Sequence, residues 1–181
     1  MEERLDGRLG SRGIDAAGNE GAPSNEASAV PAYPIVWANL QWPKTLTTTV
    51  GVTPTQNIYG QVYVPGLTNA GGPSTGILAQ LGFGPTGSAP ATWTTWKAMA
   101  YNGPAGSNYE YVTTLRPESA GVYDLLTRYS TDLGLTWTYG DQNGMGVATP
   151  GVMTVLANAD NTPPAAPTLT LDGVGASQVR L

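Results

Sequence analysis

The stretch 121-GVYDLLTRYSTDLGLTWTYG-140 decides the fold class. In its first half, Gly121–Ser130, every second residue is large or β-branched, as on one face of a strand: Tyr123, Leu125, Thr127 and Tyr129. Small and turn-forming residues follow, and the β-favouring pattern resumes at Thr136–Gly140. Two such runs joined by a short turn predict an antiparallel hairpin.

The same pattern recurs along the middle of the chain. Short β-favouring runs alternate with turn residues, and helical periodicity is nearly absent. A chain of 181 residues is long enough for one such domain plus appendages. We therefore predict an all-β fold, an antiparallel β-sandwich, with strands at Ile35–Gln41, Leu46–Val52, Asn57–Val64, Gly76–Gly82, Trp93–Tyr101, Tyr109–Leu115, Gly121–Ser130, Thr136–Gly140 and Gly151–Leu156.

Composition excludes several classes of function. Cys and His are both absent, which rules out thiolate or imidazole metal sites, disulfide-stapled folds and Cys–His or Ser–His catalysis. A net charge of −5 without a basic stripe argues against nucleic acid and anionic membranes. No stretch has the ~20 apolar residues of a membrane span, so we expect no membrane insertion.

Carboxylates give no sign of catalysis. A glycosidase needs a pair of them flanking the scissile bond. Here the candidates stand singly, mostly beside turns, and no motif pairs them. We therefore do not expect an enzyme; the residues considered are Glu110, Glu118, Asp124, Asp132 and Asp141.

Three stretches carry a resemblance to a known module: WANLQWP at 37–43, YGQVY at 59–63 and AQLGFGP at 79–85. With them, the region from Val36 to Val155 resembles an immunoglobulin-like (Ig-like) β-sandwich accessory module of secreted multidomain bacterial proteins, including amylopullulanase-type glycoside hydrolases. The resemblance implies an Ig-like antiparallel sandwich over residues 32–157, outside any catalytic domain, in an extracellular protein. The first residues carry no export signal, so we expect either that one lay upstream or that the sequence is a fragment of a longer chain, and we favour the fragment.

The two ends differ from this middle. The stretch IDAAGNEGAPSNEASAVP at 14–31 resembles the last strands of a fibronectin type III domain, and PPAAPTLTLDGVGASQVRL at 163–181 resembles the first strands of another. We therefore divide the chain into residues 1–31, 32–157 and 158–181. The halves are complementary, which predicts head-to-tail pairing between copies in a fibre or tandem array, through Ile14, Ala27, Val30, Leu169, Leu171 and Val179. The alternative is a fragment that cuts through two flanking domains.

The hairpin itself matches the S-x-D-x-G-x-T-W pattern called an Asp box. We expect Asp132 to accept backbone hydrogen bonds across the turn and Gly134 to adopt positive φ. Trp137 is expected to pack over the loop. The predicted role of this group is structural: Ser130, Asp132, Gly134, Thr136 and Trp137.

Aromatic residues on the faces opposite the aliphatic positions could form a sugar-binding platform. Flat rings stack on pyranose faces, and neighbouring amides reach the hydroxyls. The candidates are Trp42, Tyr59, Tyr63, Trp93 and Tyr101, while we expect Trp37, Trp96 and Trp137 to fill the core. Polysaccharide binding, as an accessory α-glucan-binding module of a secreted amylolytic enzyme, is therefore the alternative to self-association.

Calcium is the one cofactor that the sequence leaves open. Asp141 and Asn143 stand two residues apart ahead of Gly144, as at the start of a calcium loop. An Asx turn explains the same residues equally well. Asp160 near the other end could add a further oxygen ligand.

Overall fold

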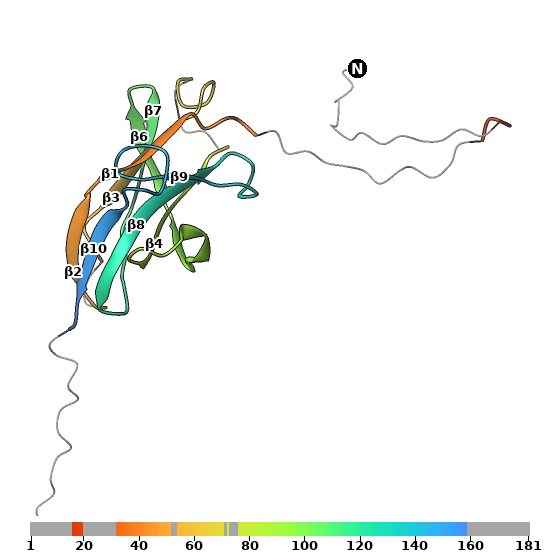
Figure 1. Ribbon diagram of the computed structural model, residues 1–181. Coiled ribbons are helices and arrows are strands. Elements are labelled where there is room, and N and C mark those ends of the chain that lie inside the picture. The colour runs from red at the N-terminus through yellow and green to blue at the C-terminus, as the bar shows by residue number, and fades with distance from the viewer. Residues whose placement is uncertain (1–15, 20–31, 52–53, 71, 73–75, 159–181) are drawn as a thin grey trace, which may run out of the picture.

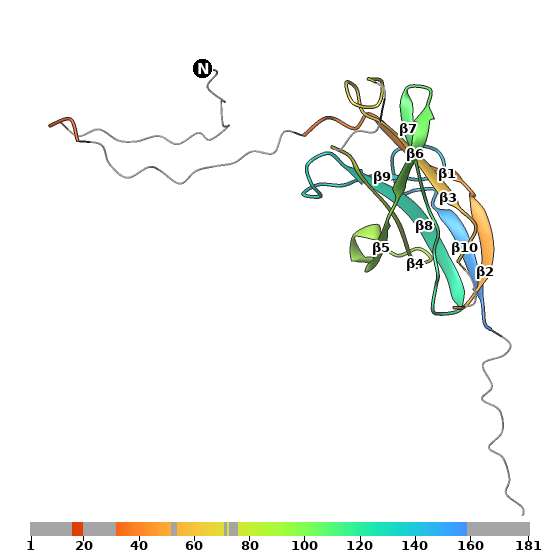
Figure 2. The ribbon, with the colours of Figure 1, turned by 180° about the vertical axis from the view of Figure 1, so that it is seen from behind.

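The computed structural model describes residues 16–19, 32–51, 54–70, 72 and 76–158, and these form two packed β-sheets (Figures 1 and 2). The four-stranded sheet has the order β1 (Trp37–Trp42), β3 (Ile58–Tyr63), β7 (Asn108–Thr113), β6 (Ala100–Ala105). The six-stranded sheet has the order β2 (Thr45–Thr49), β10 (Gly151–Leu156), β8 (Gly121–Ser130), β4 (Leu78–Pro85), β5 (Thr95–Ala98), and β9 (Thr138–Gly140) also pairs with β8. This all-β architecture is consistent with the predicted sandwich.

Helical structure in the described ranges is confined to the 3₁₀ turn η1 (Pro90–Thr92). Across those ranges, no helix has both the length and the apolar character needed to span a membrane.

The core lies between the two sheets and follows the period-two alternation of the strands. In β3 the inward residues Ile58 and Val62 are fully buried, and in β8 Leu125 and Tyr129 are fully buried. The core cluster contains tyrosines from both sheets, and Tyr129 donates a hydrogen bond to the Asn39 carbonyl (3.4 Å).

No tryptophan belongs to this core cluster among the described residues. The prediction that Trp37, Trp96 and Trp137 fill the core is therefore wrong. Tyrosines supply the aromatic volume instead, and their hydroxyls can reach backbone carbonyls from inside the sandwich.

Strand pairing is antiparallel with one exception. β2 and β10 run parallel, with Thr45 opposite Val152 and Thr49 opposite Leu156. The exception arises because the chain leaves the four-stranded sheet after β1, through the cis Trp42–Pro43 peptide, and joins the edge of the other sheet as β2. The expected wholly antiparallel sandwich is corrected in this respect.

The predicted strand Trp93–Tyr101 is two strands in different sheets. β5 pairs with β4, whereas β6 pairs with β7, and the chain crosses between the sheets at Met99. The residues Asn102–Gly103–Pro104 are typical of a turn, but they lie inside β6, where a bulge falls between Tyr101 and Gly103. An edge strand tolerates both this bulge and Pro104, because one side of its backbone needs no partner.

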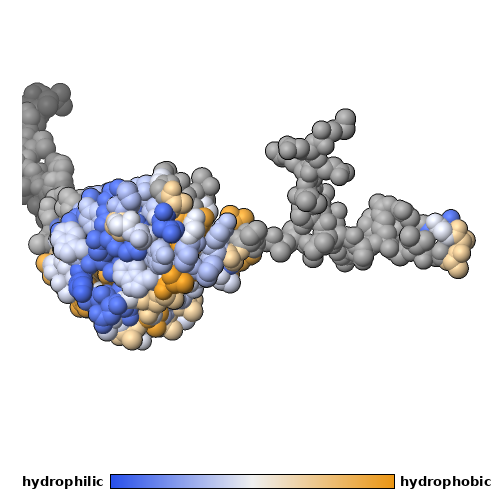
Figure 3. Space-filling model, turned by 90° about the horizontal axis from the view of Figure 1, so that it is seen from above, coloured by the Kyte–Doolittle hydropathy of each residue, from blue (hydrophilic) through white to orange (hydrophobic). Residues whose placement is uncertain are grey.

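The described chain enters and leaves the sandwich at opposite ends. Residues before β1 arrive beside the β8–β9 connection, and the chain departs after β10 at the other end (Figure 1). At the entry end, Thr131 Oγ1 donates a hydrogen bond to the Tyr33 carbonyl (2.7 Å). Figure 3, seen from above, shows hydrophobic residues gathered where the chain enters and hydrophilic residues on the other side.

Candidate functional site

The outer face of the six-stranded sheet carries a stack of tryptophans and one arginine. The rings of Trp93 and Trp96 are stacked, with centroids 5.6 Å apart and planes at 25°. Arg128 Cζ lies 3.9 Å from the Trp96 ring centroid and 4.1 Å from that of Trp137, so the guanidinium is held between two indoles. We call these four residues the tryptophan–arginine ladder.

Two glycines of β4 make room for the ladder. A Cβ at Gly82 would lie 2.4 Å from the Trp96 ring, and one at Gly84 would lie 2.3 Å from Nε1 of Trp93. Both rings therefore rest directly on the strand backbone. The cross-strand register places Gly82 opposite Trp96, which explains why this glycine position receives a ring.

Polar contacts fix the ladder. Arg128 donates to Gln80 Oε1 from Nε (2.8 Å) and Nη2 (2.6 Å), and Trp93 Nε1 donates to Ser88 Oγ (2.8 Å). Burial lowers the pKa of the Arg128 guanidinium, and hydrogen bonding to Tyr139 opposes that shift. The rings are occupied by one another, by the guanidinium and by the backbone, so the ladder is a stabilising unit of the sheet.

This finding changes the reading of Trp93. The sequence suggested an outward ring for sugar binding, but the side chain is only 7% exposed and covers Gly84. Trp93 is therefore not available as a platform. Sequence reasoning did not identify the ladder; its signal is the pair of alternate glycines, 82 and 84, beside the WTTW stretch at 93–96.

The Asp-box hairpin connects β8 to β9 through the carboxylate of Asp132. Asp132 Oδ1 accepts hydrogen bonds from the Ser130 hydroxyl (2.7 Å) and the Thr136 amide (3.0 Å), and Oδ2 accepts one from the Thr136 hydroxyl. Gly134 has φ 88°, and a Cβ there would meet the Trp137 ring at 3.3 Å. These five residues thus form one closed turn.

The donors around Asp132 favour its charged form. The Ser130 hydroxyl, followed by the hydroxyl and amide of Thr136, lowers the pKa of the carboxyl to about 2. Asp132 has its oxygens filled by protein donors, which fits a structural role in the turn.

Asp141 is engaged in the same manner in the loop after β9. Its Oδ1 accepts from the amides of Asn143 (2.9 Å) and Gly144 (3.1 Å), and its Oδ2 accepts from the Thr149 amide (3.0 Å). Burial alone would raise the pKa of this carboxyl, but these amide donors outweigh it and the pKa is lowered.

The calcium interpretation gains no support from this loop. Asn143 is exposed, and Asp160 lies outside the described residues. Within the described ranges, no group of three or more acidic side chains is placed to hold a metal ion. The geometry is that of an Asx turn.

The outer face of the four-stranded sheet carries a different arrangement. Trp42 is 50% exposed, and its ring centroid lies 6.2 Å from that of Tyr59 with the planes at 46°. Simple alternation would place Trp42 on the inner face with Ala38 and Leu40. A bulge at Gln41 shifts the register so that Trp42 pairs with Tyr59 on the outside.

Amide and carboxylate groups surround this ring pair. A shallow hollow of about 370 Å³ is lined by Gln41, Trp42, Tyr59, Asn102 and Glu110. Asn102 Nδ2 donates to Glu110 Oε1 (2.6 Å). Gln41 Oε1 is buried and has no hydrogen-bond partner among the residues that the structure describes.

The strand register extends the surface along β1 and β3. Next to the Trp42–Tyr59 pair stands Asn39 opposite Gln61, and beyond it Trp37 opposite Tyr63. Four residues of strand separate Tyr59 from Tyr63, or about 13 Å at the usual rise per residue. We call this alternation of ring pair, amide pair and ring pair the aromatic strip.

The remaining platform candidate, Tyr101, does not belong to the strip. Its ring packs edge-on against Tyr109 (5.0 Å) and Tyr111 (5.9 Å), on the core side of the four-stranded sheet. The reason is the β5–β6 crossing, which gives Tyr101 a different sheet and face from those expected. Of the five candidates, Trp42, Tyr59 and Tyr63 share one surface.

The residues proposed for self-association lie outside the described ranges. They are Ile14, Ala27, Val30, Leu169, Leu171 and Val179. The boundaries proposed at 31–32 and 157–158 fall beside residues outside the described ranges and stay predictions.

Comparison with known proteins finds similarity to one kind of enzyme. No protein-family model matches the chain. Amylopullulanases from Thermoanaerobacter thermohydrosulfuricus and Thermoanaerobacterium thermosulfurigenes are each 30% identical to it, and that from Thermoanaerobacterium saccharolyticum is 29% identical; each alignment covers 93% of this chain. The aligned part is 12%, 10% and 14% of those proteins, respectively. The chain is thus homologous to a small part of amylopullulanases and spans about a tenth of their length.

Proposed function

We propose that this chain is a non-catalytic, α-glucan-binding accessory module of a secreted amylolytic enzyme, and that the aromatic strip is its binding surface. The observation that carries the proposal is the Trp42–Tyr59 ring pair, turned outward by a bulge and bordered by amides. A half-exposed indole costs solvation free energy unless a ligand covers it. Bound glucose would cover it with the C–H groups of its ring face.

The arrangement of polar groups suits a sugar. Asn39 Oδ1 accepts from the Gln61 backbone amide (3.2 Å) and Gln61 Oε1 accepts from Asn108 Nδ2 (3.2 Å), which leaves the two side-chain NH₂ groups to donate to sugar hydroxyls. Gln41 lines the hollow beside the ring pair, and rotation of its side chain brings the buried, unpartnered Oε1 to a sugar hydroxyl.

The tilt of the rings favours α-glucans over flat polymers. Planes at 46° form an angled platform, which follows a chain that curves from one glucose to the next. A flat β-linked chain such as cellulose would need coplanar rings. The homologous proteins are named amylopullulanases, and this name agrees with an α-glucan ligand.

A non-catalytic role is supported by how the carboxylates are used. The carboxylates of Asp132 and Asp141 accept hydrogen bonds from donors in the hairpin and in the loop. Asp124 accepts one from the Gly87 amide (2.8 Å), and Glu110 accepts one from Asn102. None of these four has a second carboxylate hydrogen-bonded beside it in the described structure. We propose an extracellular location as well, because starch and pullulan supplied from outside are too large to enter a cell.

Affinity electrophoresis tests the proposal. We expect the full chain to be retarded in gels containing amylopectin or pullulan and to run freely in gels containing hydroxyethylcellulose. Trp42→Ala should strongly reduce the retardation, because the aromatic strip loses its most exposed ring. Tyr33→Ala is the matched control, since Tyr33 is also exposed (46%) but lies off the strip. A wild-type chain that migrates unchanged in both α-glucan gels would overturn the proposal.

Self-association is a second proposal, favoured by one observation. The described chain enters and leaves at opposite ends of the sandwich, so terminal strands on successive copies could meet head to tail (Figure 1). In the homologous proteins, however, the aligned stretch is part of a much longer chain, whose neighbouring segments could complete those strands instead. Sedimentation velocity at high concentration separates the two: deletion of residues 1–30 should abolish assembly, and a wild-type chain that stays monomeric would refute the fibre.

A further inference from the structure

The two sheets separate where the chain crosses from β5 to β6, and this leaves a cleft at the side of the sandwich. Thr95 and Lys97 of β5 stand opposite Phe83 and Leu81, the inward-facing residues of β4. Thr95 and Lys97 are nevertheless exposed, so the other sheet does not cover the inner side of β5. The segment at 115–119 stands there instead.

The cleft has a volume of about 580 Å³. An adjoining hollow of about 270 Å³ shares Phe83, Thr95 and Tyr123 with it and extends to Trp93. This size lies within the roughly 300–1,000 Å³ typical of small-molecule sites.

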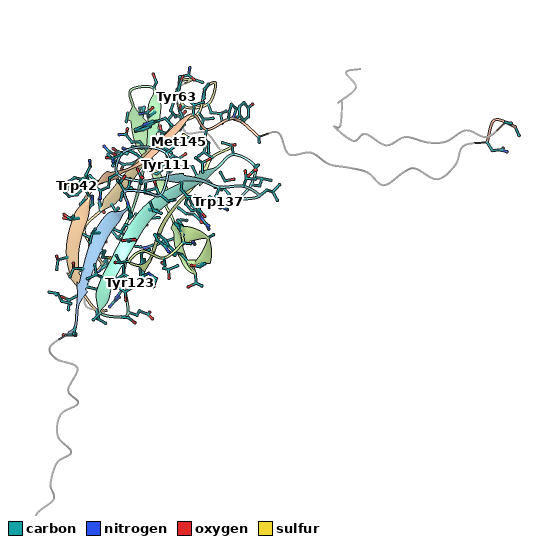
Figure 4. All side chains as sticks on the ribbon, in the orientation of Figure 1. Trp42, Tyr63, Tyr111, Tyr123, Trp137 and Met145 are labelled. Carbon is teal, nitrogen blue, oxygen red and sulfur yellow. The ribbon has the colours of Figure 1, made fainter. Side chains whose placement is uncertain are left out.

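Aromatic rings form the floor of the cleft. Phe83 and Tyr123 meet edge to face, with centroids 5.3 Å apart, and both are only partly buried against the core. Tyr123 is seen near the exit end of the sandwich in Figure 4, where Trp42 stands away from it toward β1. The floor therefore offers an apolar surface of its own, apart from the strip.

Fixed polar groups form the rim. Lys97 Nζ donates to the Thr114 carbonyl (2.7 Å), and Arg116 Nε donates to the Gly51 carbonyl (3.0 Å). Ammonium and guanidinium groups have three and five donors, so both retain donors for a ligand. Glu118 adds a carboxylate acceptor, and Thr95 and Ser119 add hydroxyls.

This combination favours a neutral, hydroxyl-rich ligand. Charges of both signs border the cleft, so no single sign selects an ion. An aromatic floor beneath convergent donors and acceptors is what a pyranose requires. A purely apolar ligand would leave the rim groups unpaired.

We propose that this cleft is a second α-glucan subsite, independent of the aromatic strip; the inference rests on the proposed function and extends it. No residue lines both the cleft and the Trp42 hollow. A short oligosaccharide then occupies either site singly. A long glucan engages both and gains from the effective concentration of the second site.

Nuclear magnetic resonance on the full ¹⁵N-labelled chain, titrated with maltotriose, tests this proposal. The indole signal of Trp42 reports on the aromatic strip. The indole signal of Trp93 and the amide signals of Lys97 and Tyr123 report on the cleft and its adjoining hollow. We expect both groups of signals to shift, with separate binding curves. In Trp42→Ala the cleft signals should still shift as in the wild type.

Variants in the cleft complete the test. Thr95→Trp fills the cleft without removing a described hydrogen bond, and should abolish the shifts at Tyr123 while leaving those at Trp42. Thr47→Trp, at an exposed position of β2, is its control. Lys97→Met should weaken maltotriose binding at the cleft about fivefold, as for one lost charge-assisted hydrogen bond, and Lys44→Met should not.

The outcomes separate the two proposals. Cleft signals that stay fixed while Trp42 shifts would overturn the second subsite and leave the strip. Cleft signals that shift while Trp42 stays fixed would overturn the strip and leave the cleft. If no signal shifts at the highest maltotriose concentration that dissolves, both the strip and the cleft are overturned as binding sites.

Discussion

The two outer faces of this sandwich both carry tryptophan, yet they use it in opposite ways. On the six-stranded sheet, Trp93 stacks on Trp96, and both rings rest on glycine backbone. Arg128 lies between Trp96 and Trp137. On the four-stranded sheet, Trp42 is 50% exposed and inclined over a polar hollow. Figure 4 shows Trp137 and Trp42 at opposite sides of the molecule.

The comparison teaches that an outward aromatic residue is available for binding only if its face is free. In the ladder the faces of the tryptophan rings are covered by other parts of the protein, so removing a ring should lower the stability of the fold. In the strip a face is free, so removing the ring should cost binding and leave stability unchanged. Substitutions on the two faces should therefore differ most in the free energy of unfolding.

Trp93→Ala should lower the free energy of unfolding most, by about 3–5 kcal/mol, because a nearly buried indole is lost from above Gly84. Chemical denaturation monitored by circular dichroism measures this value. Trp93→Phe should lose less, since a ring still covers the glycine. A loss below about 1 kcal/mol for the alanine variant would show that the ladder does not stabilise the sheet.

Gly82→Ala should cost about 1–3 kcal/mol, the usual penalty of overpacking, because the added methyl meets the Trp96 ring. A double-mutant cycle identifies the cause. In a Trp96→Ala background the methyl has room, so the same glycine substitution should cost much less. Equal costs in both backgrounds would show that the ring is not what excludes the methyl.

Arg128→Ala should cost about 2 kcal/mol, as a cation is removed from between two rings where water is partly excluded. Arg128→Lys should retain part of this stability but lose the double hydrogen bond to Gln80. Thermal unfolding compares the two variants. A lysine variant as stable as the wild type would argue against stacking by the planar guanidinium.

Asp132 should give the hairpin a pH dependence of smaller size. Its pKa in the folded chain is lowered to about 2 by Ser130 and Thr136, whereas in the unfolded chain it is near its ordinary value. Its stabilising contribution is therefore complete above pH ~4 and is lost as pH falls through about 2.

The matched variant for this measurement is Asp132→Asn. The difference in melting temperature between wild type and variant should be largest at pH 6 and should shrink between pH 4 and pH 2. A difference that is constant over this range would contradict the assignment.

Trp42→Ala should change the unfolding free energy least, by no more than about 0.5 kcal/mol, as is usual for an exposed side chain. The same variant should be retarded much less than the wild type in amylopectin gels. Denaturation and gel mobility together make the comparison sharp. If the Trp42 variant unfolds as easily as the Trp93 variant, the tryptophans on the outer faces of both sheets stabilise the fold and the contrast between them is wrong.

Local features of this protein could be predicted from the sequence, and features that depend on register could not. The hairpin around Asp132 is closed by hydrogen bonds between residues within six positions of one another. A short stretch of sequence therefore contains every residue that forms it. The strand Gly121–Ser130 was likewise predictable from alternation, and the structure has the same bounds.

The ladder and the strip depend on which strands become neighbours. The Trp96 ring lies on Gly82 only because β5 pairs with β4. The crossing at Met99 that ends β5 does not interrupt the alternation of side chains along the sequence, so the sequence does not reveal it. Similarly, Trp42 faces outward because of the bulge at Gln41. A period-two pattern cannot locate a bulge, because one inserted residue reverses the faces of all that follow.

The parallel pairing of β2 with β10 has a mechanical consequence. Tension on the two ends of the described sandwich pulls β10 directly and reaches β2 through β1, so it draws these two parallel strands in opposite directions along their length. Their ladder, from Thr45–Val152 to Thr49–Leu156, is then sheared as a whole and not unzipped one bond at a time. The sandwich should therefore yield to stretching along its long axis only at high force.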